Sequence, residues 1–137
     1  MAAFVHWPRP MSCIADELAA RVMRFAVRVV RFCRALPTEA TVAVLAKQLL
    51  RSATSASANY RAARRGRSRA EFIAKLGLVV EEADETMHWL EMIRDANLLD
   101  DRAALEELAN LLEEGRELRA IFVRSVSTAR MNQMRRS

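Results

Sequence analysis

The sequence predicts an all-α protein, an antiparallel up-down-up-down four-helix bundle. Three observations support this prediction. The 137-residue chain is 52% apolar, which is enough for one ordinary core. It contains only three glycines and three prolines, which are too few turn residues for an all-β protein. Its apolar residues recur every three or four positions in four long segments, the periodicity of amphipathic helices in a bundle.

The first helix is expected from about Ser12, a plausible N-cap, to Leu36, where Pro37 ends it. Residues 1–12 are interpreted as a disordered lead, in which Met1 and Met11 are both candidate start residues. The expected core side of this helix follows a 4-3-4-3-4 spacing and consists of Leu18, Val22, Phe25, Val29, Phe32 and Leu36.

Arginine occurs every three or four residues along this first helix. Such a density of charge excludes a membrane-spanning helix, and the segment also lacks the apolar run and cleavage site of a signal peptide. An arginine-rich amphipathic start is also found in organellar transit peptides, but the same stripe fits a bundle helix. No contact with a membrane is expected.

The second helix is expected from near Thr38 to about Arg65, and Gly66 then breaks the chain. Its core side is unusual, because small and polar residues stand where large apolar ones are normal. That side consists of Val42, Leu45, Leu49, Ser52, Ala56, Asn59 and Ala63.

The third helix is expected to begin at Ser68, because Glu71 three residues later completes a capping box. It should end near Asn97, and its core side consists of Phe72, Leu76, Val79, Ala83, Thr86, Leu90 and Ile93. The fourth helix should begin at Asp100 or Asp101 and fade around Ser127, with its core side formed by Leu105, Leu108, Leu112, Leu118 and Phe122. The bundle domain is therefore expected at 13–128, followed by a basic tail at 129–137.

Charge is segregated along the chain, although the net charge is only +5. Residues 1–69 contain 13 basic and three acidic side chains, whereas residues 70–120 contain five basic and 14 acidic ones. The two cysteines, Cys13 and Cys33, lie about 30 Å apart if both are on one helix, which is too far for a disulfide. Free thiols are typical of a reducing cytoplasm, so the protein is expected to be cytoplasmic.

The second and third helices should form a hairpin in which the numbers of facing residues sum to about 133. Ala56 then faces Gly77, and Arg51 faces Glu82. The same rule sets Gln48 opposite Glu85 and Asn59 opposite Ala74 and Lys75. The expected polar network consists of Gln48, Arg51, Ser55, Asn59, Lys75, Glu82 and Glu85. Such a network either fixes the register of the bundle or forms a surface for a ligand or partner.

The stretch from Leu49 to Ile93 resembles the signature of the four-helix-bundle proteins named after open reading frames in 23S rRNA intervening sequences. The helix lengths and the break at Pro37 also fit, so the resemblance extends over about residues 13–128. The matching residues are Gln48, Arg51, Ser52, Ser55, Ala58, Asn59, Arg67, Ser68, Glu71, Phe72, Lys75, Leu76, Glu82, Glu85 and Trp89.

This resemblance implies a small cytoplasmic bundle that assembles into a cyclic homo-oligomer, typically a homopentamer. It does not imply an activity, because most members of the family have no established biochemical role. A more distant relative is the accessory protein of diversity-generating retroelements, a basic pentamer that binds its reverse transcriptase and nucleic acid. By analogy, the partners expected here are other copies of the chain and RNA, DNA or a reverse transcriptase.

Two groups of arginines are candidates for nucleic-acid or partner binding. One lies along a face of the first helix and the other at the hairpin. The candidates are Arg21, Arg24, Arg28, Arg31, Arg61, Arg64, Arg65, Arg67 and Arg69, with Arg34 extending the first group. Arginines on a rigid helix can follow a phosphate backbone, and binding would then depend on salt. The same residues could instead pair with the acidic helices, pair with an acidic neighbour in a ring, or form a solvated face.

No catalytic, metal or cofactor site is expected. Glu85 and His88 form one Glu-x-x-His fragment, but a di-iron bundle needs a second one, and the other histidine is His6 in the lead. No phosphate-binding glycine loop or zinc spacing is present. The sequence therefore predicts a non-catalytic oligomeric module that binds RNA, DNA or a nucleic-acid enzyme through its basic surface. The alternative is a scaffold ring that contacts only proteins.

Overall fold

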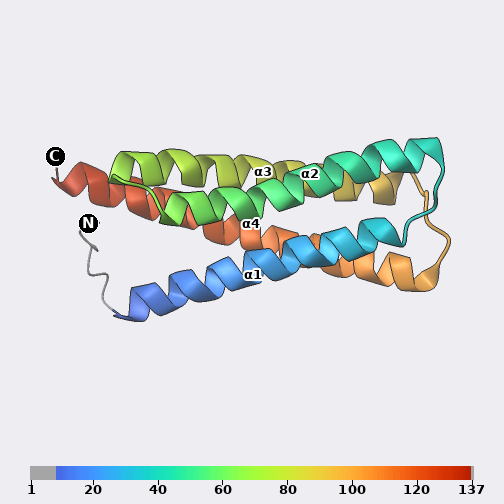
Figure 1. Cartoon of the computed structure of the whole chain (residues 1–137), viewed down its shortest axis with the longest axis horizontal. Coiled ribbons are helices and arrows are strands. Elements are labelled where there is room, and N and C mark those ends of the chain that lie inside the picture. The colour runs from blue at the N-terminus through green and yellow to red at the C-terminus, as the bar shows by residue number, and fades with distance from the viewer. Residues whose placement is uncertain (1–8, 137) are drawn as a thin grey trace.

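The computed structural model describes residues 9–136, and this range contains four helices and no strand. The helices are α1 (Arg9–Arg34), α2 (Ala40–Arg64), α3 (Arg69–Asp95) and α4 (Arg102–Arg136). The α1–α2 and α3–α4 links lie at one end of the molecule and the α2–α3 turn at the other (Figure 1). Successive helices therefore run antiparallel, and α4 returns to pack against α1. This is the up-down-up-down bundle that the sequence predicts.

The predicted apolar sides of the helices form one continuous core. All six residues predicted for the core side of α1 are buried. The predictions fail at Leu105, which is 43% exposed, and Leu45, Asn59 and Phe72 are only half-buried. The largest fully buried side chains come from all four helices and include Val22, Val29, Leu49, Leu76, Met87, Leu90, Ile93, Leu108, Leu111, Leu118 and Phe122.

Helix α1 begins three residues before the predicted N-cap, so the end of the expected disordered lead, residues 9–12, is helical. Pro10 lies in the first turn, where its missing N–H interrupts no intrahelical hydrogen bond. The rest of that lead, residues 1–8, lies outside the described residues. At its other end α1 stops at Arg34, and the N–H of Leu36 bonds to the carbonyl of Cys33 at 3.3 Å in a closing turn before Pro37.

Two of the predicted caps are present. The hydroxyl of Ser68 accepts the N–H of Glu71 at 3.0 Å, and the Glu71 carboxylate accepts the N–H of Arg67 at 3.3 Å. Asp101 accepts the N–H of Ala104 at 2.9 Å, which identifies it as the cap of α4. A Cβ added at Gly66 would lie 3.0 Å from the carbonyl oxygen of Ala63, so a glycine allows the tight turn between α2 and α3.

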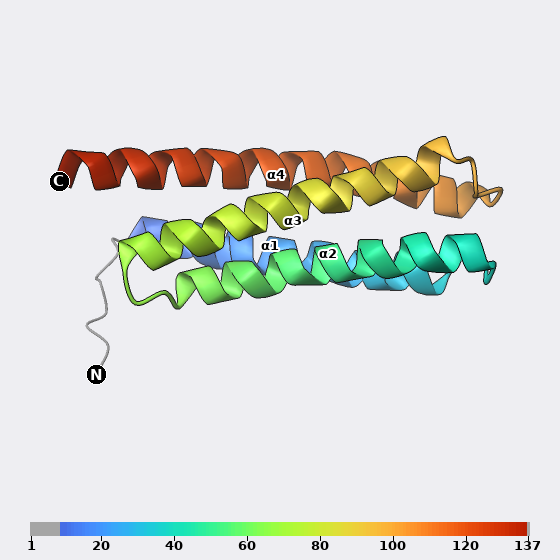
Figure 2. The ribbon, with the colours of Figure 1, turned by 90° about the horizontal axis from the view of Figure 1, so that it is seen from above.

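Helix α4 continues to Arg136, whereas the sequence predicted that it would fade around Ser127 and leave a basic tail at 129–137. Residues 127–136 contain no glycine or proline that would end a helix. Val126 and Ala129 are also buried, so packing continues past the predicted end. The last turns of α4 project beyond the α2–α3 turn (Figure 2).

The sequence sets Ala56 opposite Gly77, but the packing does not require a glycine at position 77. A Cβ added there would have no atom within 4 Å. The glycine that the packing requires is Gly115 of α4. A Cβ at that position would lie 2.5 Å from the sulfur of Met87 and 3.4 Å from the ring of Phe25. Ala56 instead borders a small void of about 10 Å³ beside Gly115.

These two glycines give a matched test of the packing. We expect Gly77→Ala to raise the free energy of unfolding by about 0.5–1 kcal/mol, because alanine is the better helix former. Gly115→Ala should lower it, because an overpacking cost of about 1–3 kcal/mol outweighs the same helix gain. Urea denaturation followed by circular dichroism measures both. Equal stabilisation by the two substitutions would show that the Met87 side chain moves away freely.

Candidate functional site

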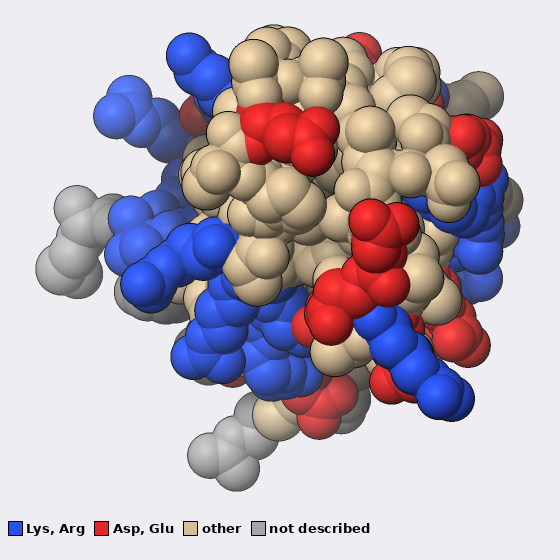
Figure 3. All heavy atoms as spheres, turned by 90° about the vertical axis from the view of Figure 1, so that its right-hand side faces the viewer, with Lys and Arg blue, Asp and Glu red and all other residues tan. Residues whose placement is uncertain are grey.

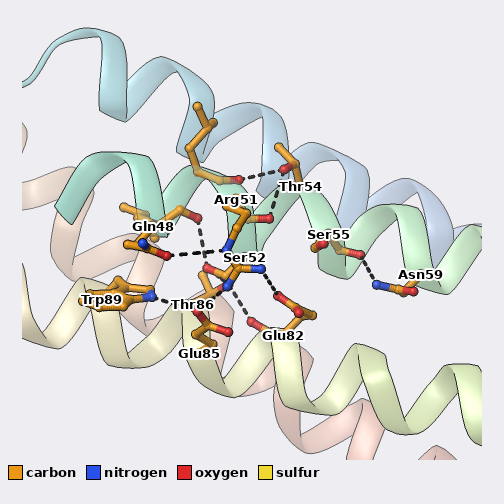
Figure 4. Close-up of polar contacts among 12 residues, drawn as sticks. Gln48, Arg51, Ser52, Thr54, Ser55, Asn59, Glu82, Glu85, Thr86 and Trp89 are labelled. Atoms are coloured by element: carbon orange, nitrogen blue, oxygen red, sulfur yellow. Dashed lines mark hydrogen bonds and ion pairs between the residues drawn. The ribbon is translucent and has the colours of Figure 1, made fainter. Parts of the chain in front are cut away.

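Arg51 joins α2 to α3 by contacting two glutamates. Its Nη1 lies 3.5 Å from the carboxylate of Glu82, and its Nη2 donates to the carboxylate of Glu85. Figure 4 shows Gln48 and Trp89 on the same side of this contact, with the indole Nε1 of Trp89 donating to Glu85 at 3.2 Å. The hydrogen bond from Arg51, followed by that from Trp89, lowers the pKa of Glu85 below its usual range. The carboxylate is therefore ionised at neutral pH.

This network lies on the surface of the bundle and is smaller than the sequence predicts. The Arg51 side chain is 48% exposed. Gln48 contacts Arg51 at 3.5 Å on the same helix, and the structure gives it no hydrogen bond to Glu85 within residues 9–136. Asn59 donates to the carbonyl of Ser55 at 2.9 Å, so these two residues bond within α2 and not across to α3. Lys75 is half-buried.

The buried polar contact between α2 and α3 is made by Ser52 and Thr86. Their hydroxyl oxygens lie 2.9 Å apart, and each also reaches a carbonyl of its own helix, Leu49 or Glu82. Both side chains are fully buried. Sequence reasoning placed both on core-facing seams but assigned them no role. The available signal was that each of the two seams carries a small hydroxyl residue, but the hairpin rule did not set them opposite each other, since their numbers sum to 138 and not to about 133.

The predicted arginine stripe of α1 divides into two kinds of residue. Arg21 binds Glu114 of α4 with two hydrogen bonds of 2.8 and 2.6 Å, and it also reaches Glu117 at 2.5 Å. Arg28 binds Glu107 of α4 at 2.7 Å. Both are half-buried, whereas Arg24 and Arg31 are exposed. The stripe therefore both fastens α1 to α4 and presents charge to solvent.

The hairpin arginines lie around the end of α2 and the start of α3. Arg64 pairs with Asp16 of α1. The structure assigns no ion pair within residues 9–136 to the other members, which are Arg61, Arg65, Arg67 and Arg69.

At the opposite end of the bundle, Figure 3 shows Lys and Arg gathered most densely on the lower left, with Asp and Glu mainly toward the lower right.

Among the described residues, those that could support redox or metal chemistry are either bonded to other side chains or do not cluster into a site. Glu85 of the Glu-x-x-His fragment is bound by Arg51, and the exposed His88 ring lies edge-on to Trp89 with centroids 4.9 Å apart. Within residues 9–136 no group of three His, Cys, Asp or Glu side chains could hold a metal ion. Cys13 and Cys33 are both free, and burial raises the pKa of the Cys33 thiol to about 11. That thiol is therefore a poor nucleophile at neutral pH.

In the part of the chain that the structure describes, no helix combines the length and apolar character needed to cross a membrane.

Comparisons with known proteins identify one family. The family described as "23S rRNA-intervening sequence protein" matches residues 17–123. A solved structure from the S23 ribosomal protein family of Bacteroides thetaiotaomicron, a protein of unknown function, is 31% identical to this chain. The similarity covers 82% of this chain and 97% of the other, with a TM-score of 0.73. No curated protein matches the chain.

The α1–α4 ion pair predicts a pH-dependent stability. The hydrogen bond from Arg21 lowers the pKa of Glu114 below its ordinary value of 4.5. The pair therefore stabilises the folded chain above that pH, and the stabilisation is lost as the pH falls through the lowered pKa. We expect Arg21→Gln to reduce the free energy of unfolding by about 1 kcal/mol at neutral pH, and this loss should shrink as the pH falls through the lowered pKa of Glu114.

Arg31→Gln is the matched control, because Arg31 is an exposed member of the same stripe. Its effect should stay within about 0.5 kcal/mol at every pH. Urea titrations of the wild type and both variants at several pH values make the comparison. A loss for Arg21→Gln that persists unchanged at low pH would contradict the electrostatic explanation.

Proposed function

This chain belongs to the family of 23S rRNA-intervening sequence proteins, and we propose that it is a non-catalytic, oligomeric binding module for RNA or DNA. The contact is made by the exposed arginines of α1 and of the α2–α3 hairpin. A nucleic-acid enzyme such as a reverse transcriptase is a partner that the same surface could serve. The location proposed for this activity is the cytoplasm.

The proposal rests on a difference in ion pairing: some arginines of the α1 stripe are paired with glutamates and others are not. Arg21 and Arg28 are each bonded to glutamates of α4, so the bundle has acidic partners for only part of the stripe. The candidate arginines to which no ion pair is assigned within residues 9–136 are Arg24, Arg31, Arg61, Arg65, Arg67 and Arg69. A surface of this kind attracts a polyanion and releases its counterions.

A second candidate function is a scaffold ring, and an exposed apolar strip on α1 favours it. Met23, Val27 and Val30 follow one another at four- and three-residue spacing and are 54%, 39% and 36% exposed. Side chains of this size on one helix face are suited to burial against another protein. We propose that copies of the chain associate through this strip, and that the ring is a homopentamer. The ring and the nucleic-acid contact are compatible.

Nucleic-acid binding should be strongly salt-dependent. We expect a labelled single-stranded RNA to bind at about 50 mM salt and to bind much more weakly at about 200 mM. The double variant Arg24→Gln/Arg31→Gln should reduce the logarithmic salt slope by about 1.4, since each lost phosphate contact removes about 0.7. Fluorescence anisotropy measures both quantities, with DNA tested in parallel.

Arg102→Gln/Arg116→Gln is the matched control, because it removes the same charge from exposed positions on α4. It should leave the slope nearly unchanged. If neither RNA nor DNA binds at low salt, direct contact with nucleic acid is ruled out.

Self-association should depend on the apolar strip. We expect Val27→Lys/Val30→Lys to convert the oligomer to smaller species, because the lysines would bury charge at the contact. Light scattering after size exclusion measures the mass, and circular dichroism checks that the helices remain. Val44→Lys/Val123→Lys changes exposed valines elsewhere, at 62% and 45% exposure, and should leave the mass unchanged. A wild-type mass of one subunit would contradict the ring.

A further inference from the structure

An open hollow of about 520 Å³ lies between α1 and the last turns of α2. One of its sides is apolar and is formed by Ala19, Ala20 and Met23 of α1. The other side is polar and comes from α2, with Ser57, Tyr60, Arg61, Arg64 and Arg65. Three guanidinium groups therefore border one hollow. No acidic side chain lines it within the described residues.

Tyr60 is the residue that distinguishes this hollow from an ordinary basic surface. Its side chain is only 5% exposed, and its ring packs on Phe122 of α4 with centroids 5.2 Å apart. Within the described residues the structure gives its hydroxyl no hydrogen-bond partner, and that hydroxyl is not one of the polar atoms cut off from solvent. Although the ring is buried, the O–H therefore keeps access to solvent, and since Tyr60 lines the hollow it is available to donate to a bound group.

The charges around Tyr60 favour an anionic partner. Burial raises the pKa of Tyr60 above its usual range, the nearby Arg64 opposes that shift, and Asp16 adds to it. The hydroxyl is therefore protonated at neutral pH and can donate. Arg64 already binds Asp16, whose side chain is 64% exposed, so an anion in the hollow would compete with that carboxylate. To Arg61 and Arg65 the structure assigns no ion pair within residues 9–136.

We infer that this hollow binds a phosphate group of a nucleic-acid strand, with the Tyr60 hydroxyl and the guanidinium groups of Arg61, Arg64 and Arg65 donating to its oxygens. Arginine is well suited to phosphate because its planar N–H groups match the spacing of the oxygens. The volume exceeds what one phosphate needs, and Ala19 and Ala20 offer an apolar surface for the attached sugar or base. This inference rests on the proposed nucleic-acid binding and gives it a specific place.

The test compares variants of the hollow with a matched pair outside it. The probes are a labelled single-stranded RNA, ATP and inorganic phosphate, all measured with the 137-residue chain at one low salt concentration. Tyr60→Phe keeps the ring on Phe122 and removes only the hydroxyl. We expect it to weaken RNA binding about tenfold, the usual effect of losing a hydrogen bond to a charged group.

Arg61→Gln/Arg65→Gln should weaken RNA binding at least about tenfold more than Arg31→Gln/Arg34→Gln, because only the first pair lies in the hollow. Asp16→Asn should strengthen binding, since it frees Arg64, and it should do so more than Asp100→Asn, which removes the same charge at the far end of the bundle. Unchanged binding by Tyr60→Phe, or equal losses for the two arginine pairs, would overturn the inference.

The two proposals fail in different ways. If the wild type binds RNA but the hollow variants behave like their controls, nucleic-acid binding stands and the hollow does not. If RNA fails to bind while ATP or inorganic phosphate binds in a manner that depends on Tyr60, the hollow stands as a site for a free phosphate compound. If none of the three probes binds, the inference about the hollow is wrong.

Discussion

The close packing of α2 against α3 is the constraint on which the rest of the bundle depends. Ser52 and Thr86 meet there fully buried, and their hydroxyl oxygens are 2.9 Å apart. Small side chains continue along α2 at Ala53, Ala56 and Ala63, which are also buried. At these small positions of α2, large side chains of the neighbouring helices supply the volume. Phe25 of α1 and Phe122 of α4 border the same void as Ala56.

Long charged side chains supplement this packing on the other side of α1. Arg21 and Arg28 reach the glutamates of α4 and fasten α1 to that helix. A two-bond contact between a guanidinium and a carboxylate fixes orientation as well as distance. Toward the α2–α3 turn, small residues of α1 and arginines of α2 leave space between the helices, and this space is the hollow beside Tyr60.

Sequence periodicity predicted the number, order and direction of the helices, because a 3.6-residue repeat records which face must be buried. The hairpin rule also placed Arg51 opposite Glu82, which lie 3.5 Å apart. It could not show that Glu85 is a further partner, or that Asn59 bonds within its own helix, since these outcomes depend on side-chain conformations. The end of α4 was predicted too early because its last apolar positions are small or sparse. The hollow was not predictable, since it arises from how far apart two helices lie.

The two uses of arginine in this protein differ in their sensitivity to salt. The side chains of Arg21 and Glu114 are 31% and 21% exposed and bonded at 2.6 Å, so mobile ions screen their contact only weakly. Exposed arginines such as Arg31 gain affinity for a polyanion through counterion release, which salt opposes directly. If the proposed nucleic-acid contact exists, rising salt should weaken it before it loosens α1 from α4. On that proposal, ionic strength would select between bound and free states of a bundle that keeps the same fold in both.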